Sequence, residues 1–152
     1  MLFHDQGKFS DAQPLYRRAI SILEEETEYA EINIIFNNLA LLFHERGEYT
    51  KAEPLYRRAV EVGEKQLGPD HPEVATSMNN LASLLNDKKA HTEAEPLCRR
   101  ALEIREKHLG ADHPDVATSI YNLAELLKKQ EEVDAAKALL GRIPVYYTPN
   151  LD

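Results

Sequence analysis

One four-residue pattern recurs along the chain at a constant interval. Asn37-Asn38-Leu39-Ala40, Asn79-Asn80-Leu81-Ala82 and Tyr121-Asn122-Leu123-Ala124 stand 42 residues apart. A period of about 20 to 50 residues is typical of repeat arrays, in which each unit buries its apolar face against its neighbours. The sequence therefore predicts an elongated stack of repeats, and function is to be sought on the surface that the stack builds.

A second repeated segment predicts where helices begin. It reads Ala-x-Pro-Leu-x-Arg-Arg-Ala and starts at Ala12, Ala52 and Ala94. A Ser or Thr stands three residues before a Gln or Glu in each copy, which is the capping-box pattern of a helix N-terminus. Three helices are expected to start there, with each proline in the first turn, where a lost backbone donor costs little. The pairs are Ser10 with Gln13, Thr50 with Glu53, and Thr92 with Glu95, followed by Pro14, Pro54 and Pro96.

Turn residues predict the other helix ends. These helices are expected to run to about Gln66 and His108 and to stop at Gly68 and Gly110, since glycine suits the C-terminal turn. Asp-His-Pro at 70–72 and at 112–114 then begins the next helix, because proline is favoured at the first helical position. Short loops predict a pair of antiparallel helices in each repeat. The linker over 23–32 lacks these signals, and a different turn is expected there.

The repeats predict the organisation of the whole chain. We expect an array over 1–143, with a partial repeat at 1–26, repeats at 27–68 and 69–110, and a repeat with a truncated second helix at 111–143. The tail over 144–152 is predicted to be non-helical, and its aromatic residues either cover the last helix face or stay free. The chain begins inside a repeat, which indicates a piece of a longer array.

Composition and charge exclude several classes of protein. With 43% hydrophobic and 29% charged residues, the chain has no apolar run of the roughly 18 residues that a membrane span needs. A formal net charge of -8 opposes binding to the phosphates of nucleic acid. Residues 1–7 do not resemble a secretory signal, and the single cysteine, Cys98, fits a reducing compartment. We therefore expect a cytoplasmic protein with no nucleic-acid or membrane partner.

Catalytic and metal-binding patterns are missing from the sequence. There is no glycine-rich phosphate loop and no nucleophile elbow. The histidines and aspartates at 70, 71, 112, 113 and 115 recur once per repeat, too far apart to share one ion. Cys98 stands where other repeats carry tyrosine, which indicates a packed thiol and not a nucleophile. We expect no enzyme, no cofactor and no metal.

The repeats resemble a known family. The large, small and aromatic residues of the tetratricopeptide pattern are matched in three registers. The 42-residue period and the sequence around the Leu-Gly-x-Asp-His-Pro motif resemble tetratricopeptide repeats of the kinesin-light-chain and nephrocystin-3 type. The resemblance covers roughly residues 2 to 142. The first register is Phe36, Leu39, Ala40, Phe43, Ala52, Tyr56 and Ala59; the second is Met78, Leu81, Ala82, Leu85, Ala94, Cys98 and Ala101; the third is Ile120, Leu123, Ala124, Leu127, Ala136 and Leu140.

The resemblance implies an all-α fold, a right-handed α-solenoid of antiparallel helix pairs. Its first helices would line a concave groove that receives an extended peptide or a helix of a partner protein. In kinesin light chains such a groove takes short acidic cargo peptides. The matched groove positions in this chain are Asn37, Asn38, Leu41, His44, Asn79, Asn80, Ser83, Asn86, Tyr121, Asn122, Glu125 and Lys128.

Two interpretations of the asparagines stay open at this point. An amide both donates and accepts, so one Asn can bind the N–H and C=O of an extended backbone. Alternatively, one Asn per repeat bonds the adjacent helix as a structural ladder. The matching alternative for the whole chain is a structural element, or one that self-associates through its terminal repeats.

Overall fold

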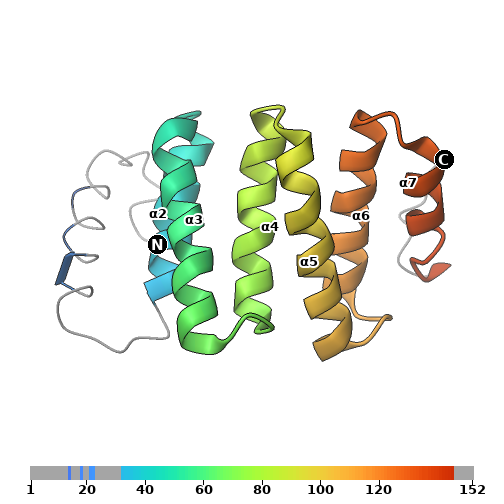
Figure 1. Ribbon diagram of the computed structural model, residues 1–152, viewed down its shortest axis with the longest axis horizontal. Helices are drawn as coiled ribbons and strands as arrows, with labels where there is room; N and C mark the ends of the chain where they lie inside the picture. The colour runs from blue at the N-terminus through green and yellow to red at the C-terminus, as the bar shows by residue number, and fades with distance from the viewer. Residues whose placement is uncertain (1–13, 15–17, 19–20, 23–31, 146–152) are drawn as a thin grey trace.

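The computed structural model describes residues 14, 18, 21, 22 and 32–145. The continuous part holds six helices and no strand, and the helices follow one another along the molecule from α2 to α7, with α2 behind α3 in the view of Figure 1. This confirms the all-α solenoid of helix pairs. The helices are α2 (Ile32–Glu45), α3 (Tyr49–Leu67), α4 (Pro72–Asp87), α5 (His91–Leu109), α6 (Pro114–Lys129) and α7 (Val133–Leu140).

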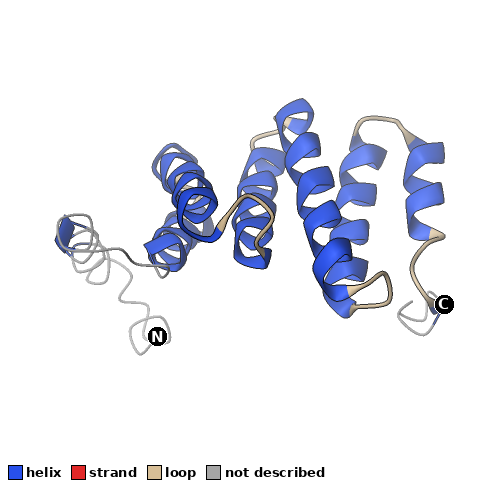
Figure 2. Cartoon of the chain, turned by 60° about the horizontal axis from the view of Figure 1, so that its bottom comes forward, coloured by secondary structure: helices blue, strands red, loops and turns tan. Residues whose placement is uncertain are grey.

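Each helix packs mainly on its neighbours in sequence. α2 pairs with α3 and α4 pairs with α5, while α3 also packs on α4 and α5 on α6. The turned view in Figure 2 shows the same succession of hairpins. One cluster of buried apolar residues runs through the row, from Phe43 and Tyr56 through Leu85 to Leu123. The core is therefore a continuous layer between the helices, as an array requires.

Most predicted helix ends are confirmed. α3 ends at Leu67 and α5 at Leu109, each followed by a glycine at positive φ. The N–H groups of Gly68 and Gly110 donate to carbonyls of the last helical turn. The helices α4 and α6 begin at Pro72 and Pro114, as the Asp-His-Pro signal predicts. α7 stops at Leu140, directly before Gly141.

The capping-box prediction is wrong for α3 and α5. These helices begin at Tyr49 and His91, so Thr50 and Thr92 lie inside the first turn and make no capping hydrogen bond. The carboxylate that would complete the first box is used elsewhere, because Glu53 accepts from Arg57 on its own helix and from Lys88 after α4. The segment with Ser10 and Gln13 lies outside the described residues.

The two prolines also lie deeper in their helices than predicted. Pro54 and Pro96 follow the first turn of α3 and α5 and stand inside the helices. Each removes one backbone N–H donor from the helix. Thr50 and Thr92, whose carbonyls lose that donor, are exposed, so water can replace it.

Parts of the predicted organisation are not covered by the described residues. The linker over 23–31, most of the partial repeat at 1–26 and the tail over 146–152 lie outside them. The repeat boundaries therefore remain predictions. No helix in the described part of the chain is long and apolar enough to cross a membrane.

Candidate functional site

The groove positions predicted from the sequence all lie on the first helices α2, α4 and α6. The first asparagine of each pair joins neighbouring helices. Asn37, which is 8% exposed, donates through Nδ2 to the hydroxyl of Ser77 on α4 at 2.7 Å. Asn79 makes the equivalent bond to Ser119 on α6 at 3.4 Å. Because both serines are buried, these bonds form a ladder inside the stack, as the structural interpretation describes.

The second asparagine of each pair is more accessible. Asn38 on α2 and Asn122 on α6 are exposed, and neither side-chain amide makes a hydrogen bond within the described part of the chain. Asn80 is half-buried and donates to the side-chain oxygen of Asn37 at 3.4 Å. The amides of Asn38 and Asn122 are therefore open for donation and acceptance, and Asn80 keeps its own oxygen open.

The predicted residues nearer the helix C-termini mostly contact one another or the next helix. His44 Nε2 lies 2.8 Å from the Asp87 carboxylate on α4, and Asn86 accepts from Lys129 on α6 at 3.1 Å. Lys128 pairs with Glu125 at 2.6 Å, and this hydrogen bond raises the pKa of the lysine.

Three of the predicted positions make no such contact within the described residues. Leu41 and Ser83 are exposed, and so is Tyr121, which stands 53% exposed at the place of the ladder asparagines. Ser83 adds a hydroxyl, and Tyr121 an aromatic ring, to the accessible surface of the first helices.

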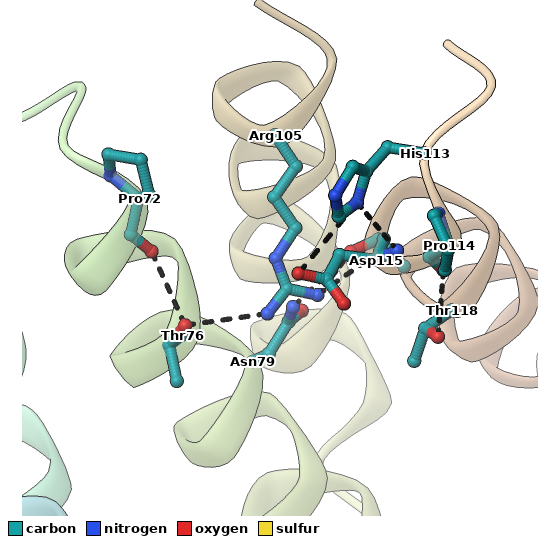
Figure 3. A network of polar contacts seen from close by, with 9 residues as sticks. Pro72, Thr76, Asn79, Arg105, His113, Pro114, Asp115 and Thr118 are labelled. Atoms are coloured by element: carbon teal, nitrogen blue, oxygen red, sulfur yellow. Dashed lines mark hydrogen bonds and ion pairs between the residues drawn. The ribbon is translucent and has the colours of Figure 1, made fainter. Parts of the chain in front are cut away.

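Arg105 also lies at this face, although the sequence did not predict it there. This residue lies on the second helix α5, but its guanidinium reaches between α4 and α6 (Figure 3). Nη1 donates to Ser119 Oγ at 2.8 Å and to the Asp115 carbonyl at 3.3 Å, and Nη2 donates to Thr76 Oγ1 at 3.4 Å. The available signal was a break in the repeat, because the equivalent residue of α3 is Gly63.

Arg105 brings a positive charge to the face of the first helices. Its three acceptors are all uncharged, and burial lowers the pKa of the guanidinium, which still stays protonated. A guanidinium has five N–H donors. Two of them, on Nε and Nη2, therefore have no acceptor within the described residues, and these two nitrogens can bind both oxygens of a carboxylate or phosphate.

The histidines of the Asp-His-Pro segments have a structural role. Nδ1 of His71 accepts from the backbone N–H of Glu73 at 3.2 Å, and His113 accepts from Asp115 at 3.1 Å. Each imidazole therefore caps the helix that follows it, α4 or α6. Among the described residues, no group of three or more His, Cys, Asp or Glu side chains could hold a metal ion.

Cys98 is a packed thiol, as predicted. It lies in the main apolar cluster between the helices. Burial raises its pKa to about 11, so the thiolate that a nucleophile requires is scarce at neutral pH.

Comparison with known proteins decides the family. Two tetratricopeptide repeat models match residues 31–90 and residues 74–115. The chain belongs to the tetratricopeptide repeat family. No match was found among curated protein sequences.

Several solved structures share the fold of this tetratricopeptide chain. BtubC (BKLC) from P. vanneervenii is 28% identical with a TM-score of 0.85, and the match covers 93% of this chain and 56% of BtubC. Repeats of a Podosopora anserina protein described as a kinesin light chain are 23% identical with a TM-score of 0.80, covering 92% of this chain and 67% of that one. RapI is 21% identical with a TM-score of 0.75, and the match covers 90% of this chain and 48% of RapI. The chain thus spans little more than half of BtubC.

Proposed function

We propose that the face formed by α2, α4 and α6 binds an extended segment of a partner protein. Tetratricopeptide repeat proteins in general serve as non-enzymatic scaffolds for protein interaction. The observation that carries the proposal for this face is the row of second asparagines. Asn38, Asn80 and Asn122 occupy equivalent positions on three successive helices, and their amides are wholly or partly open.

Amides suit an extended peptide because they read its backbone and not its side chains. Each primary amide can donate to a backbone C=O and accept from a backbone N–H. An extended chain presents such groups at regular intervals, whereas a helix has already paired them. A row of amides therefore favours an extended segment over a helical one.

Arg105 adds charge complementarity to this face. Its two free N–H donors lie between α4 and α6, beside the ladder bond from Asn79 to Ser119. A carboxylate on the partner would accept from these two donors and add to the negative charge of Asp115, which already acts on the half-buried guanidinium. A charged hydrogen bond of this kind contributes about 1.5 to 3 kcal/mol. We therefore propose that the partner segment carries an acidic residue at this point.

Peptide selection and matched alanine variants test this function. Peptides are selected from a display library on the wild-type chain, and their affinity is then measured for Asn38→Ala with Asn122→Ala, and for Arg105→Ala. The double variant is expected to bind about 5- to 30-fold more weakly, for a loss of about 1 to 2 kcal/mol. Its melting temperature should stay close to that of the wild type, because both asparagines are exposed.

Asn37→Ala is the matched control because this asparagine lies in the ladder. It leaves the hydroxyl of the buried Ser77 without its bonded amide, and the expected cost in the free energy of unfolding is about 1 to 3 kcal/mol. Selected peptides that bind the double variant and the wild type equally would contradict the proposed groove. Selection of no binding peptide would also count against it.

Self-association through the terminal repeats is a separate hypothesis. Light scattering over a wide range of concentrations tests it, and a constant monomer mass would remove it. We also propose a cytoplasmic location, because the buried Cys98 is a free thiol and free thiols are typical of reducing compartments.

A further inference from the structure

The two junctions between first helices differ at one pair of equivalent residues. A junction here is the place where two successive first helices meet. At the junction of α2 with α4, the residue of helix α3 that faces both helices is Gly63, which has no side chain. Behind the junction of α4 with α6, helix α5 carries Arg105, whose guanidinium lies between the two helices (Figure 3). Equivalent residues of two repeats thus place a large side chain in one junction and nothing in the other.

The same hydrogen bonds are longer or missing where Arg105 lies. The ladder bond is 2.7 Å from Asn37 to Ser77, but 3.4 Å from Asn79 to Ser119. Asn80 bonds back to Asn37 across the first junction, whereas the equivalent residue, Asn122, makes no bond to Asn79. Close backbone approaches, with Cα atoms within 8 Å, are also more frequent between α2 and α4 than between α4 and α6. The second junction is therefore the wider one.

Gly63 explains why the first junction can close. A Cβ atom built on this glycine would lie 3.1 Å from Cγ2 of Val74 on α4 and 3.6 Å from Nδ2 of Asn33 on α2. Neighbouring side chains thus already fill the space in front of the α3 backbone. Any larger residue at this place would have to push α2 and α4 apart, because packed interiors do not absorb extra atoms without shifts.

We propose that Arg105 is a spacer that holds α4 and α6 apart, and that Gly63 sets the closer approach of α2 to α4. The guanidinium is fixed from both sides, by Thr76 on α4 and by Ser119 with the Asp115 carbonyl on α6. It therefore bridges the two helices at a set distance. The curvature of the array is uneven for this reason. In each repeat, the residue equivalent to Arg105 controls it. This inference does not depend on the proposed peptide binding.

Pulsed electron spin resonance distances test the spacer. Nitroxide labels are placed in the full chain at the equivalent positions Leu41 and Ser83, or Ser83 and Glu125, one pair for each junction. In the wild type the second distance is expected to exceed the first. Arg105→Ala is expected to shorten the 83–125 distance by between about 1 and 3.5 Å, the upper value being one layer of atoms. The 41–83 distance should stay unchanged.

Three further variants make the test specific. Arg99→Ala, an exposed arginine of the same helix that pairs with Glu95, should change neither distance. Arg105→Lys should keep most of the spacing, because the long side chain remains. Gly63→Arg should lengthen the 41–83 distance. If Arg105→Ala folds with wild-type helicity and leaves the 83–125 distance unchanged, or if the two wild-type distances are equal, the proposal is wrong.

Discussion

Residues at equivalent positions of the repeats have different structural roles in this array. Asn33, Ala75 and Ala117 are one such set, and only Asn33 is a polar side chain. It is fully buried, and among the described residues neither its Oδ1 nor its Nδ2 has a hydrogen-bond partner. A buried polar group without a partner costs about 1 to 3 kcal/mol. Asn33 is therefore a local weakness beside Gly63, whose missing side chain leaves space for the amide.

Replacing Asn33 with Leu is expected to stabilise the protein. The branching of the heavy atoms is kept, the unpaired polar atoms are removed, and leucine has the higher helix propensity. We expect a gain of about 1 kcal/mol in the free energy of unfolding, measured as an increased urea midpoint. Asn38→Leu on the exposed face of α2 is the control and should show only the propensity gain. A lower midpoint for the Asn33 variant would mean that the amide is bonded in solution.

Cys98 provides a second prediction at this scale. Its pKa is raised to about 11 by burial, and the thiolate is the reactive form. The native protein is expected to react with Ellman's reagent at pH 8 at least about a hundredfold more slowly than the urea-unfolded protein, since only a small thiolate fraction is present and access is limited. Equal rates in the two states would show that the core around α5 opens readily.

At the scale of the helix pair, the turns decide where each element ends. The turn between first and second helix has a residue at positive φ in each repeat: Gly47 at 72°, Lys89 at 62° and Glu131 at 67°. Only glycine adopts this left-handed region without steric cost. Glycine stands only in the first of these three turns, and Lys89 and Glu131 replace it in the other two. The same turn forms in all three because the packing of the paired helices fixes their ends.

Lys89→Gly is expected to raise the stability of the α4–α5 turn. The left-handed conformation costs a non-glycine residue about 1 to 2 kcal/mol, and the entropy of glycine in the unfolded chain offsets about half of this. A net gain of about 0.5 to 1 kcal/mol should appear in thermal unfolding. Gly47→Ala is the opposite case and should lose stability by strain alone, since a Cβ there meets no atom within 4 Å. No effect in either variant would mean that the turns relax in solution.

Over the whole molecule, the repeats are joined by the ladder, by the apolar layer and by charges on the second helices. Glu53 on α3 accepts from Lys88 beyond α4, and Glu95 on α5 is bonded by Gln130 beyond α6. The hydrogen bond from Lys88, followed by that from Arg57, lowers the pKa of Glu53 below its usual value. These contacts link one repeat to the next at equivalent places.

Acid should weaken the link made by Glu53. A folded-state pKa that is lowered contributes stability above the ordinary pKa of about 4.5, and this stability is lost as the pH falls through the folded value. Glu53→Gln is therefore expected to cost about 0.5 to 1 kcal/mol at pH 7 and nothing at a pH below the folded pKa. The measurement is urea unfolding at a series of pH values. Glu61→Gln, which breaks pairs within one helix, should cost less; a constant loss at every pH would rule out a charge effect.

The sequence by itself determined the repeat, the succession of helices and the ends marked by Gly68, Pro72, Gly110 and Pro114. These follow from local backbone preference and from the apolar period, both of which are written along the chain. The capping boxes at Thr50 and Thr92 were predicted wrongly, and the two carboxylates bond to other side chains: Glu53 to Arg57 and Lys88, and Glu95 to Arg99 and Gln130. Local patterns cannot report contacts between distant segments.

Only the tertiary structure decided which asparagine of each pair is buried. Asn37 and Asn38 are neighbours in sequence, but one lies between α2 and α4 and the other faces outward. The tertiary structure also brought Arg105 from a second helix to the face of the first helices, where it contacts Thr76 and Ser119. The physical reason is that burial and hydrogen-bond partners arise from helix packing, which in these contacts brings together residues 14 to 40 positions apart. The repeat pattern, in contrast, specifies only which residues are equivalent.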